Sequence, residues 1–135
     1  MILGGFTACK SKTKAITATK TQAPSIAWLS EANLEQAKTQ AIASGKSVFV
    51  DIGTDWCGYC KKMKRNIYTN NAVASAMNAG FVPLSLDGER GDGRALVSKL
   101  GIAGFPTQLI LDSKGNVLKK NTGYLNTKQL LAFLK

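Results

Sequence analysis

Two cysteines separated by two residues are the feature of this chain best suited to chemistry. Cys57 and Cys60 stand in the stretch TDWCGYCKKMKR, which spans residues 54–65. A CxxC pair fits three kinds of site: a redox couple that alternates between dithiol and disulfide, half of a metal site, and a small structural disulfide. The surrounding sequence has to decide among them.

A structural disulfide and a metal site both fit the chain poorly. A bridge across so short a loop adds at most about 2 kcal/mol in the chain-entropy model, against about 4.7 kcal/mol for a loop of about 100 residues. Structural zinc takes four ligands, whereas the chain has three cysteines and no histidine. We therefore expect no metal, and a Cu(I) ion held by two thiolates is the alternative that stays open.

A redox couple agrees with the elements expected on either side of the cysteines. The apolar, β-branched run at 47–52 predicts a strand buried on both faces, and a helix is expected to begin near Cys57. Free N–H groups and the macrodipole at a helix N-terminus stabilise an anion, and such settings lower a cysteine pKa from about 8.5 to between roughly 3.5 and 7.5. We predict that Cys57 is the exposed nucleophilic thiolate and that Cys60, one turn further, is the resolving thiol.

Five residues beside the pair are expected to support this chemistry. Lys61 and Lys62 add positive charge near the Cys57 sulfur, which favours its thiolate. Gly58 leaves the approach to that sulfur open, and Trp56 and Tyr59 offer apolar surface around it. We predict that Trp56, Gly58 and Tyr59 contact the substrate.

The rest of the folded region alternates predicted strands with predicted helices. Such alternation argues for an α/β fold with a mostly parallel sheet, to which a final hairpin adds an antiparallel edge. Hydrophobic periodicity and turn residues place strands at 26–29, 47–52, 81–86, 107–111 and 116–121, and helices at 31–44, from the CxxC to 80 with a break at 69–71, at 92–100, and from Asn126 or Thr127 onward.

Single residues are expected to set the ends of these elements. Ser30 should cap the first helix and Gly45 should end it. Asp92 should cap the short helix expected at 92–100. Pro83 has no N–H to donate to a ladder, so part of the strand at 81–86 should lie at the edge of the sheet.

The chain is basic, with 18 Lys and Arg against 8 Asp and Glu and a formal net charge of +10. Four of the positive residues precede Pro24 in a segment without acidic residues, and four more lie within 61–65. We interpret both groups as solvated surface, because no nucleic-acid motif accompanies them, and we expect no nucleic-acid partner. No apolar run approaches the roughly 20 residues that a membrane-spanning helix needs.

The N-terminal residues predict attachment to a membrane through a lipid. Residues 1–9, MILGGFTAC, resemble the last part of a bacterial lipoprotein signal, which is cut before a cysteine that then carries the lipid; here that cysteine is Cys9. A ragged N-terminus with a free thiol at Cys9 is the alternative, since no positive n-region precedes the apolar stretch. Residues 10–24 read as a flexible tether that reaches on the order of 20 Å, and residues 25–135 as one domain.

Two separated motifs resemble the thioredoxin superfamily. VDIGTDWCGYC is followed much later by GIAGFPT, and the likeness runs from about Trp28 to Lys135. Within the superfamily, the chain is most similar to the thioredoxin-like domains of exported bacterial thiol–disulfide proteins, whose TDWCGxCK this stretch follows. The resemblance implies a thioredoxin fold, in which helices flank a central mixed sheet with a C-terminal antiparallel hairpin.

The resemblance also implies roles for residues outside the CxxC. Pro106 matches the cis-proline that lies against the disulfide, and the backbone beside it pairs with the substrate, so Phe105 and Thr107 would influence substrate choice. Asp51 matches the family's buried acid, which would have a raised pKa and would accept the proton of Cys60; a merely structural carboxylate is the alternative. Pro83 stands where thioredoxin has a lysine that interacts with this acid.

These expectations combine into a thiol–disulfide oxidoreductase that reduces disulfides in exported proteins through Cys57 and Cys60. It would need no cofactor beyond that disulfide. Its partners would be disulfide-containing proteins and a membrane or periplasmic electron donor, and it would act as a monomer on the periplasmic side of a bacterial cell envelope. A disulfide oxidase or isomerase stays open, as does a tethered binding module for a partner or a metal with little redox turnover.

Overall fold

The central strand β1 (Ser47–Gly53) is the apolar run that was predicted to be buried. The computed structural model describes residues 4–5, 23–29 and 33–135. Around β1, the order of strands in the sheet is β2-β1-β3-β4. β2 (Phe81–Asp87) runs parallel to β1, whereas β3 (Thr107–Leu111) and β4 (Val117–Thr122) each pair antiparallel with their neighbours.

The sheet is therefore mixed, as the family resemblance implied. The expectation of a mostly parallel sheet was wrong for β3, which lies inside the sheet and pairs antiparallel with β1. The hairpin of β3 and β4 is confirmed. Pro83 lies in β2, one of the two edge strands, as its missing N–H predicted.

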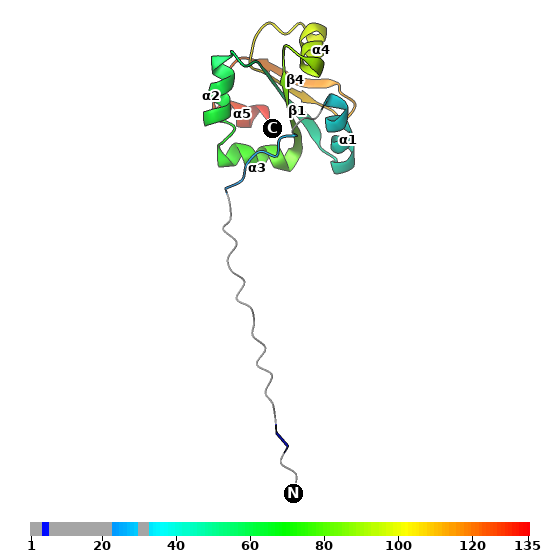
Figure 1. The fold of residues 1–135 in the computed structure, drawn as a ribbon, viewed down its shortest axis with the longest axis vertical. Coiled ribbons are helices and arrows are strands. Elements are labelled where there is room, and N and C mark those ends of the chain that lie inside the picture. The colour runs from blue at the N-terminus through cyan, green and yellow to red at the C-terminus, as the bar shows by residue number, and fades with distance from the viewer. Residues whose placement is uncertain (1–3, 6–22, 30–32) are drawn as a thin grey trace.

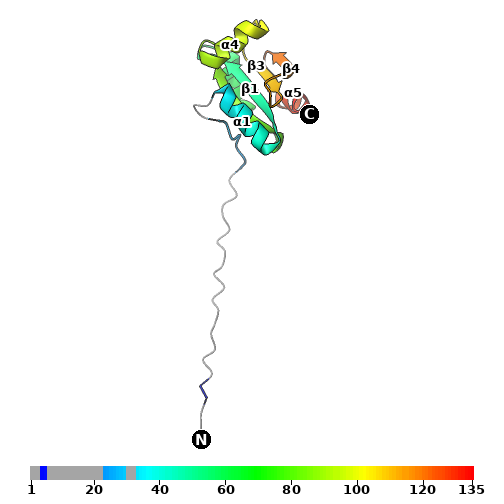
Figure 2. The ribbon, with the colours of Figure 1, turned by 90° about the vertical axis from the view of Figure 1, so that its right-hand side faces the viewer.

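Helices cover both faces of the sheet, as Figures 1 and 2 show. α1 (Leu34–Ser44) and α4 (Gly91–Leu100) pack on the face that receives Val48, Val50 and Ile52 of β1. The opposite face receives Phe49 and is covered by α2 (Gly58–Asn66), α3 (Asn71–Gly80) and α5 (Thr127–Phe133). Alternate residues of β1 thus enter two separate cores, which is why the whole strand reads as apolar.

Three local predictions differ from the structure. The segment 26–29 forms no strand, but only one parallel bridge from Leu29 to Leu84 of β2. α1 begins at Leu34 and is capped by Asn33 in a reciprocal pair of hydrogen bonds with Gln36, while Ser30 lies outside the described residues. The stop at Gly45 is confirmed, with a left-handed φ of 67° that glycine adopts without strain.

Asp92 does not cap α4. Arg90 occupies the N-cap position of that helix without a side-chain hydrogen bond. The Asp92 carboxylate instead accepts the backbone N–H of Leu34 over 2.8 Å and so satisfies the first turn of α1. The acid joins two helices that pack on the same face of the sheet.

The break expected at 69–71 separates α2 from α3, and Asn70 caps the second of these helices. α5 begins after Asn126, which forms a reciprocal capping pair with Gln129. Across the described ranges, no helix has both the length and the apolar character to cross a membrane.

Candidate active site

Cys57 occupies the N-cap of α2, directly after the loop that leaves β1. Its sulfur accepts the backbone N–H of Cys60 over 3.1 Å, so it points into the open first turn of the helix. The two cysteines form a disulfide. The helix N-terminus predicted for Cys57 is confirmed, and an anion at this sulfur would receive the stabilisation of free N–H groups and the macrodipole.

The disulfide is more buried than expected. Cys57 is 5% exposed and Cys60 is 3% exposed, so the prediction of a freely exposed Cys57 was wrong for the disulfide form. Part of the burial of Cys60 comes from the chain at Gly53, which passes closely behind its sulfur. A Cβ at Gly53 would lie 3.1 Å from the Cys60 sulfur, which is why the strand ends in glycine here.

The antiparallel direction of β3 brings a second loop to the cysteines. Thr107, the first residue of β3, is the register partner of Ile52 near the end of β1. The bond between Phe105 and Pro106 is cis, as the family resemblance implied. The Phe105 ring meets the Trp56 indole edge to face, with centroids 6.1 Å apart, so the two loops are in contact.

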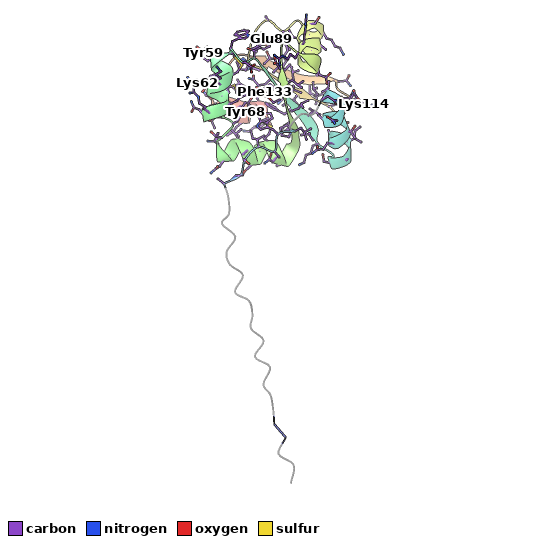
Figure 3. All side chains as sticks on the ribbon, in the orientation of Figure 1. Tyr59, Lys62, Tyr68, Glu89, Lys114 and Phe133 are labelled. Carbon is purple, nitrogen blue, oxygen red and sulfur yellow. A yellow bond between two sulfur atoms is a disulfide. The ribbon has the colours of Figure 1, made fainter. Side chains whose placement is uncertain are left out.

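Two aromatic side chains beside the disulfide are open to solvent. Trp56 is 68% exposed and Tyr59 is 62% exposed, and Gly58 between them has no heavy atom within 4 Å of the place of a Cβ. The Trp56 indole N–H donates to the Glu89 carboxylate over 2.6 Å. Figure 3 places Tyr59 on α2 and Glu89 in the loop after β2.

Thr107 differs from the other residues predicted to contact a substrate. Its side chain is fully buried, and its hydroxyl donates to the carbonyl of Gly104 over 2.7 Å. It therefore supports the loop that carries Phe105 and Pro106, and its side chain does not reach the surface.

Asp51 lies in β1 two residues before Gly53 and therefore on the same face of the strand, the face on which the Cys60 sulfur packs at Gly53. It is 2% exposed, and burial raises its pKa from 3.8 to about 6. Tyr68, in the turn after α2, donates its hydroxyl to the Asp51 carboxylate over 2.7 Å. The Tyr68 hydrogen bond and the charge of Lys64 both lower the pKa of Asp51 and partly offset its burial. The raised pKa expected for this acid is confirmed.

No sequence pattern predicted the contacts of Tyr68 and Glu89, because each side chain reaches a partner that lies far from it in the chain. Pro83, for which the resemblance implied a lysine in thioredoxin, is the register partner of Phe49, and Ser85 is the register partner of Asp51. Lys64 of α2 is the positive charge that acts on this acid. Cys9 lies outside the described residues. Among those that are described, no group of three or more His, Cys, Asp or Glu side chains is arranged to hold a metal.

A cysteine pair at the start of a helix, beside a cis-proline loop on a mixed sheet, places the molecule in the class of thioredoxin-fold domains. The family model described as the thioredoxin-like domain matches residues 34–135. The chain therefore belongs to the thioredoxin-like domain family.

Relatives and solved structures agree with this assignment. The thiol:disulfide interchange protein DsbD of Tatumella citrea is 32% identical in an alignment of 107 positions that covers 77% of this chain and 18% of that protein. The chain thus spans a small part of this relative. A candidate disulphide-isomerase from Bacteroides thetaiotaomicron is 35% identical with a TM-score of 0.75, covering 84% of this chain and 93% of that one. The oxidised C-terminal domain of DsbD from Neisseria meningitidis shares the fold, with a TM-score of 0.60 at 21% identity over 73% of this chain and 86% of that one.

Proposed function

We propose that this protein is a thiol–disulfide oxidoreductase that reduces disulfides in exported proteins. The observation that carries the proposal is the placement of the Cys57 sulfur at the N-cap of α2, where it accepts a backbone N–H and is bonded to Cys60. A thiolate at that position is stabilised as a nucleophile and as a leaving group. The relationship to thiol:disulfide interchange proteins supports the same chemistry.

The reaction begins from the reduced dithiol. The Cys57 thiolate attacks one sulfur of a substrate disulfide, that disulfide breaks, and the other substrate sulfur leaves as a thiolate. Cys60 then gives up its proton and attacks Cys57, so that the mixed disulfide breaks and the Cys57–Cys60 disulfide forms. Two electrons pass from the domain to the substrate, and a partner dithiol has to return them.

Asp51 would accept the Cys60 proton in the second step. A pKa of about 6 leaves most of this carboxylate ionised at neutral pH, so the carboxylate can act as a base. The same raised pKa makes the carboxylate a better proton acceptor than an exposed aspartate. The loop of Phe105 and Pro106 and the exposed rings of Trp56 and Tyr59 would hold the substrate chain across the disulfide.

An insulin-reduction assay with dithiothreitol tests the activity. The full chain with Cys9→Ser, which removes the third thiol, should accelerate the turbidity, and the same chain with Cys57→Ser should not. Equal rates for the two would contradict the proposal and favour a binding module. With Cys60→Ser, mixed disulfides should accumulate on Cys57, and mass spectrometry of these adducts would identify the substrates.

The direction of electron flow requires a reduction potential. CxxC proteins span about −270 to −120 mV, and about 30 mV corresponds to 1.4 kcal/mol. Equilibration of the protein with glutathione redox buffers should give a value near the reducing end of this range. A value near the oxidising end would instead identify an oxidase or isomerase.

The place of action is a separate proposal. We place the domain on the periplasmic side of a bacterial cell envelope, where disulfides persist, anchored through a lipid on Cys9. Mass spectrometry of the membrane fraction should find a lipid-modified peptide that begins at Cys9. An unmodified Met1 peptide in the soluble fraction would contradict the anchor without affecting the proposed chemistry.

A further inference from the structure

Tyr68 is held rigidly at the buried acid of the site. Its ring meets the Trp28 indole edge to face at 5.1 Å between centroids and also packs on Phe49 at 6.3 Å. Its backbone N–H donates to the Met63 carbonyl over 2.9 Å. With both the ring and the backbone fixed, the hydroxyl has one orientation in which it donates to Asp51, over 2.7 Å.

Few charged groups face Asp51. The register partners on the adjacent strands are Ser85 of β2 and Gln108 of β3, and neither is charged. From α2, Lys64 acts on the carboxylate through its charge. The described N-terminal residues 23–28 contribute no charged side chain to this region. Among the described residues, Tyr68 and Lys64 are thus the two whose side chains lower the pKa of this acid.

A pocket connects this acid with solvent. It has a volume of about 520 Å³, and its lining includes Asp51, Tyr68, Lys64 and Ser85. A space of this size with several polar groups accommodates water. A proton that reaches Asp51 can therefore leave the buried site through this pocket.

We propose that Tyr68 is a positioning residue, which holds the Asp51 carboxylate ready to accept the Cys60 proton, and that Lys64 assists it from the pocket. The inference rests on the proposed function. In the resolving step the S–H bond of Cys60 breaks and its proton passes to Asp51. The Cys60 sulfur forms a bond with the Cys57 sulfur, the bond from Cys57 to the substrate sulfur breaks, and that electron pair leaves with the substrate thiolate.

The direction of the effect follows from the causes of the Asp51 pKa. Burial raises this pKa to about 6, and both Tyr68 and Lys64 lower it. Loss of either group should therefore raise the pKa further and reduce the ionised fraction of the base. A hydrogen bond to a charged group corresponds to roughly one pKa unit, so at pH near 6 the ionised fraction should fall about five-fold, whereas near pH 8 it should hardly change.

Stopped-flow reaction with dithiobis(nitrobenzoate), an aromatic disulfide that releases a coloured thiolate, separates the two steps. In the reduced full chain with Cys9→Ser, attack by Cys57 releases one coloured thiolate at a rate proportional to the reagent. Attack by Cys60 then releases the second at a rate independent of the reagent. Tyr68→Phe, added to this Cys9→Ser parent, keeps the aromatic ring and removes only the hydroxyl. It should shift the pH midpoint of the second phase upward by about one unit, while the rate of the first phase stays as in the parent.

Matched variants make the test specific. Tyr124→Phe removes the hydroxyl of a half-buried tyrosine but keeps its ring, which packs on Tyr59 and not on Asp51, so it should leave both phases unchanged. Lys64→Gln should shift the second phase in the same direction by a smaller amount that decreases with salt, whereas Arg65→Gln removes one charge from the same helix and should have no such effect. If Tyr68→Phe does not fold, Lys64→Gln and its control decide the question.

Three results would contradict the inference. The pH midpoint of the second phase could be the same in Tyr68→Phe as in the Cys9→Ser parent. The pH midpoint in Lys64→Gln could be the same as that in Arg65→Gln. Alternatively, both phases of Tyr68→Phe could slow together with a loss of thermal stability, which would show a structural role only. A parent protein that releases no second coloured thiolate would instead contradict the proposed oxidoreductase, and this outcome is distinguishable from the other three.

Discussion

Removing the charge of Asp51 should stabilise the protein at neutral pH. The folded protein raises the pKa of this acid from 3.8 to about 6, and one pKa unit corresponds to about 1.4 kcal/mol. Above pH 6 the native state therefore carries a buried carboxylate whose ionisation lowers the free energy of unfolding by about 3 kcal/mol relative to the protonated form. Asp51→Asn is neutral at every pH and retains an oxygen that can accept the Tyr68 hydroxyl.

The sign of the pH dependence follows from linkage. Between about pH 4 and pH 6 the folded state holds the Asp51 proton more firmly than the unfolded state, so the stabilisation present at low pH is lost as the pH rises. The parent and Asp51→Asn should have similar free energies of unfolding near pH 4. By pH 7 the variant should be more stable by about 3 kcal/mol.

Urea unfolding of the disulfide form at several pH values between about 4 and 8 measures this difference. Parallel stability curves for the parent and Asp51→Asn would refute the reasoning, as would a more stable parent at pH 7. The same variant should lose much of the rate of the Cys60 step, so that stability and activity change in opposite directions.

Three further predictions concern the surface loops. Glu89→Leu removes the acceptor of the Trp56 indole N–H and should raise the KM for a protein disulfide a few-fold, while Glu89→Gln, which keeps an acceptor, should remain near the parent; equal values for both would contradict this. Gly88→Ala would place a Cβ against the Phe105 ring. The substitution should slow the reaction with protein substrates more than it slows the reaction with dithiothreitol, whereas equal slowing of both reactions would point to a general defect. Hydrogen bonds from Asn116 lower the pKa of Asp112, so Asp112→Asn should destabilise the protein at neutral pH and this difference should shrink as the pH falls through that lowered pKa, as urea unfolding would show.

Local patterns in the sequence predicted most of the elements that position the cysteines. The apolar run of β1, the glycine stop of α1 and the turn between β3 and β4 are each encoded within a few neighbouring residues. Asn33 was overlooked as a cap, although Gln36 three residues later completes a recognisable capping pair. Ser30 is an equally suitable residue type, and side-chain type alone does not distinguish the two positions.

The remaining errors concern contacts between distant segments. Asp92 reads as a local cap, but its carboxylate finds the N–H of Leu34 in another helix. The hydrogen bond of Tyr68 to Asp51 joins residues 17 apart, and no periodicity in either segment predicts it. The burial of Cys57 likewise depends on how several segments pack together, so the helix N-terminus was predictable from the sequence whereas the exposure of the sulfur was not.

The direction of β3 has a consequence for the order in which the parts of the candidate active site are synthesised. Both sulfurs and Asp51 belong to the segment from β1 to α2, whereas the cis-proline loop arrives with β3, whose antiparallel course returns it to the same end of the sheet. A nascent chain that ends after α4 already contains the cysteine pair, Trp56 and Tyr59, but lacks the loop of Phe105 and Pro106. The cysteines are thus made with the first half of the domain, and the cis-proline loop that we propose to hold the substrate is added only with its C-terminal third.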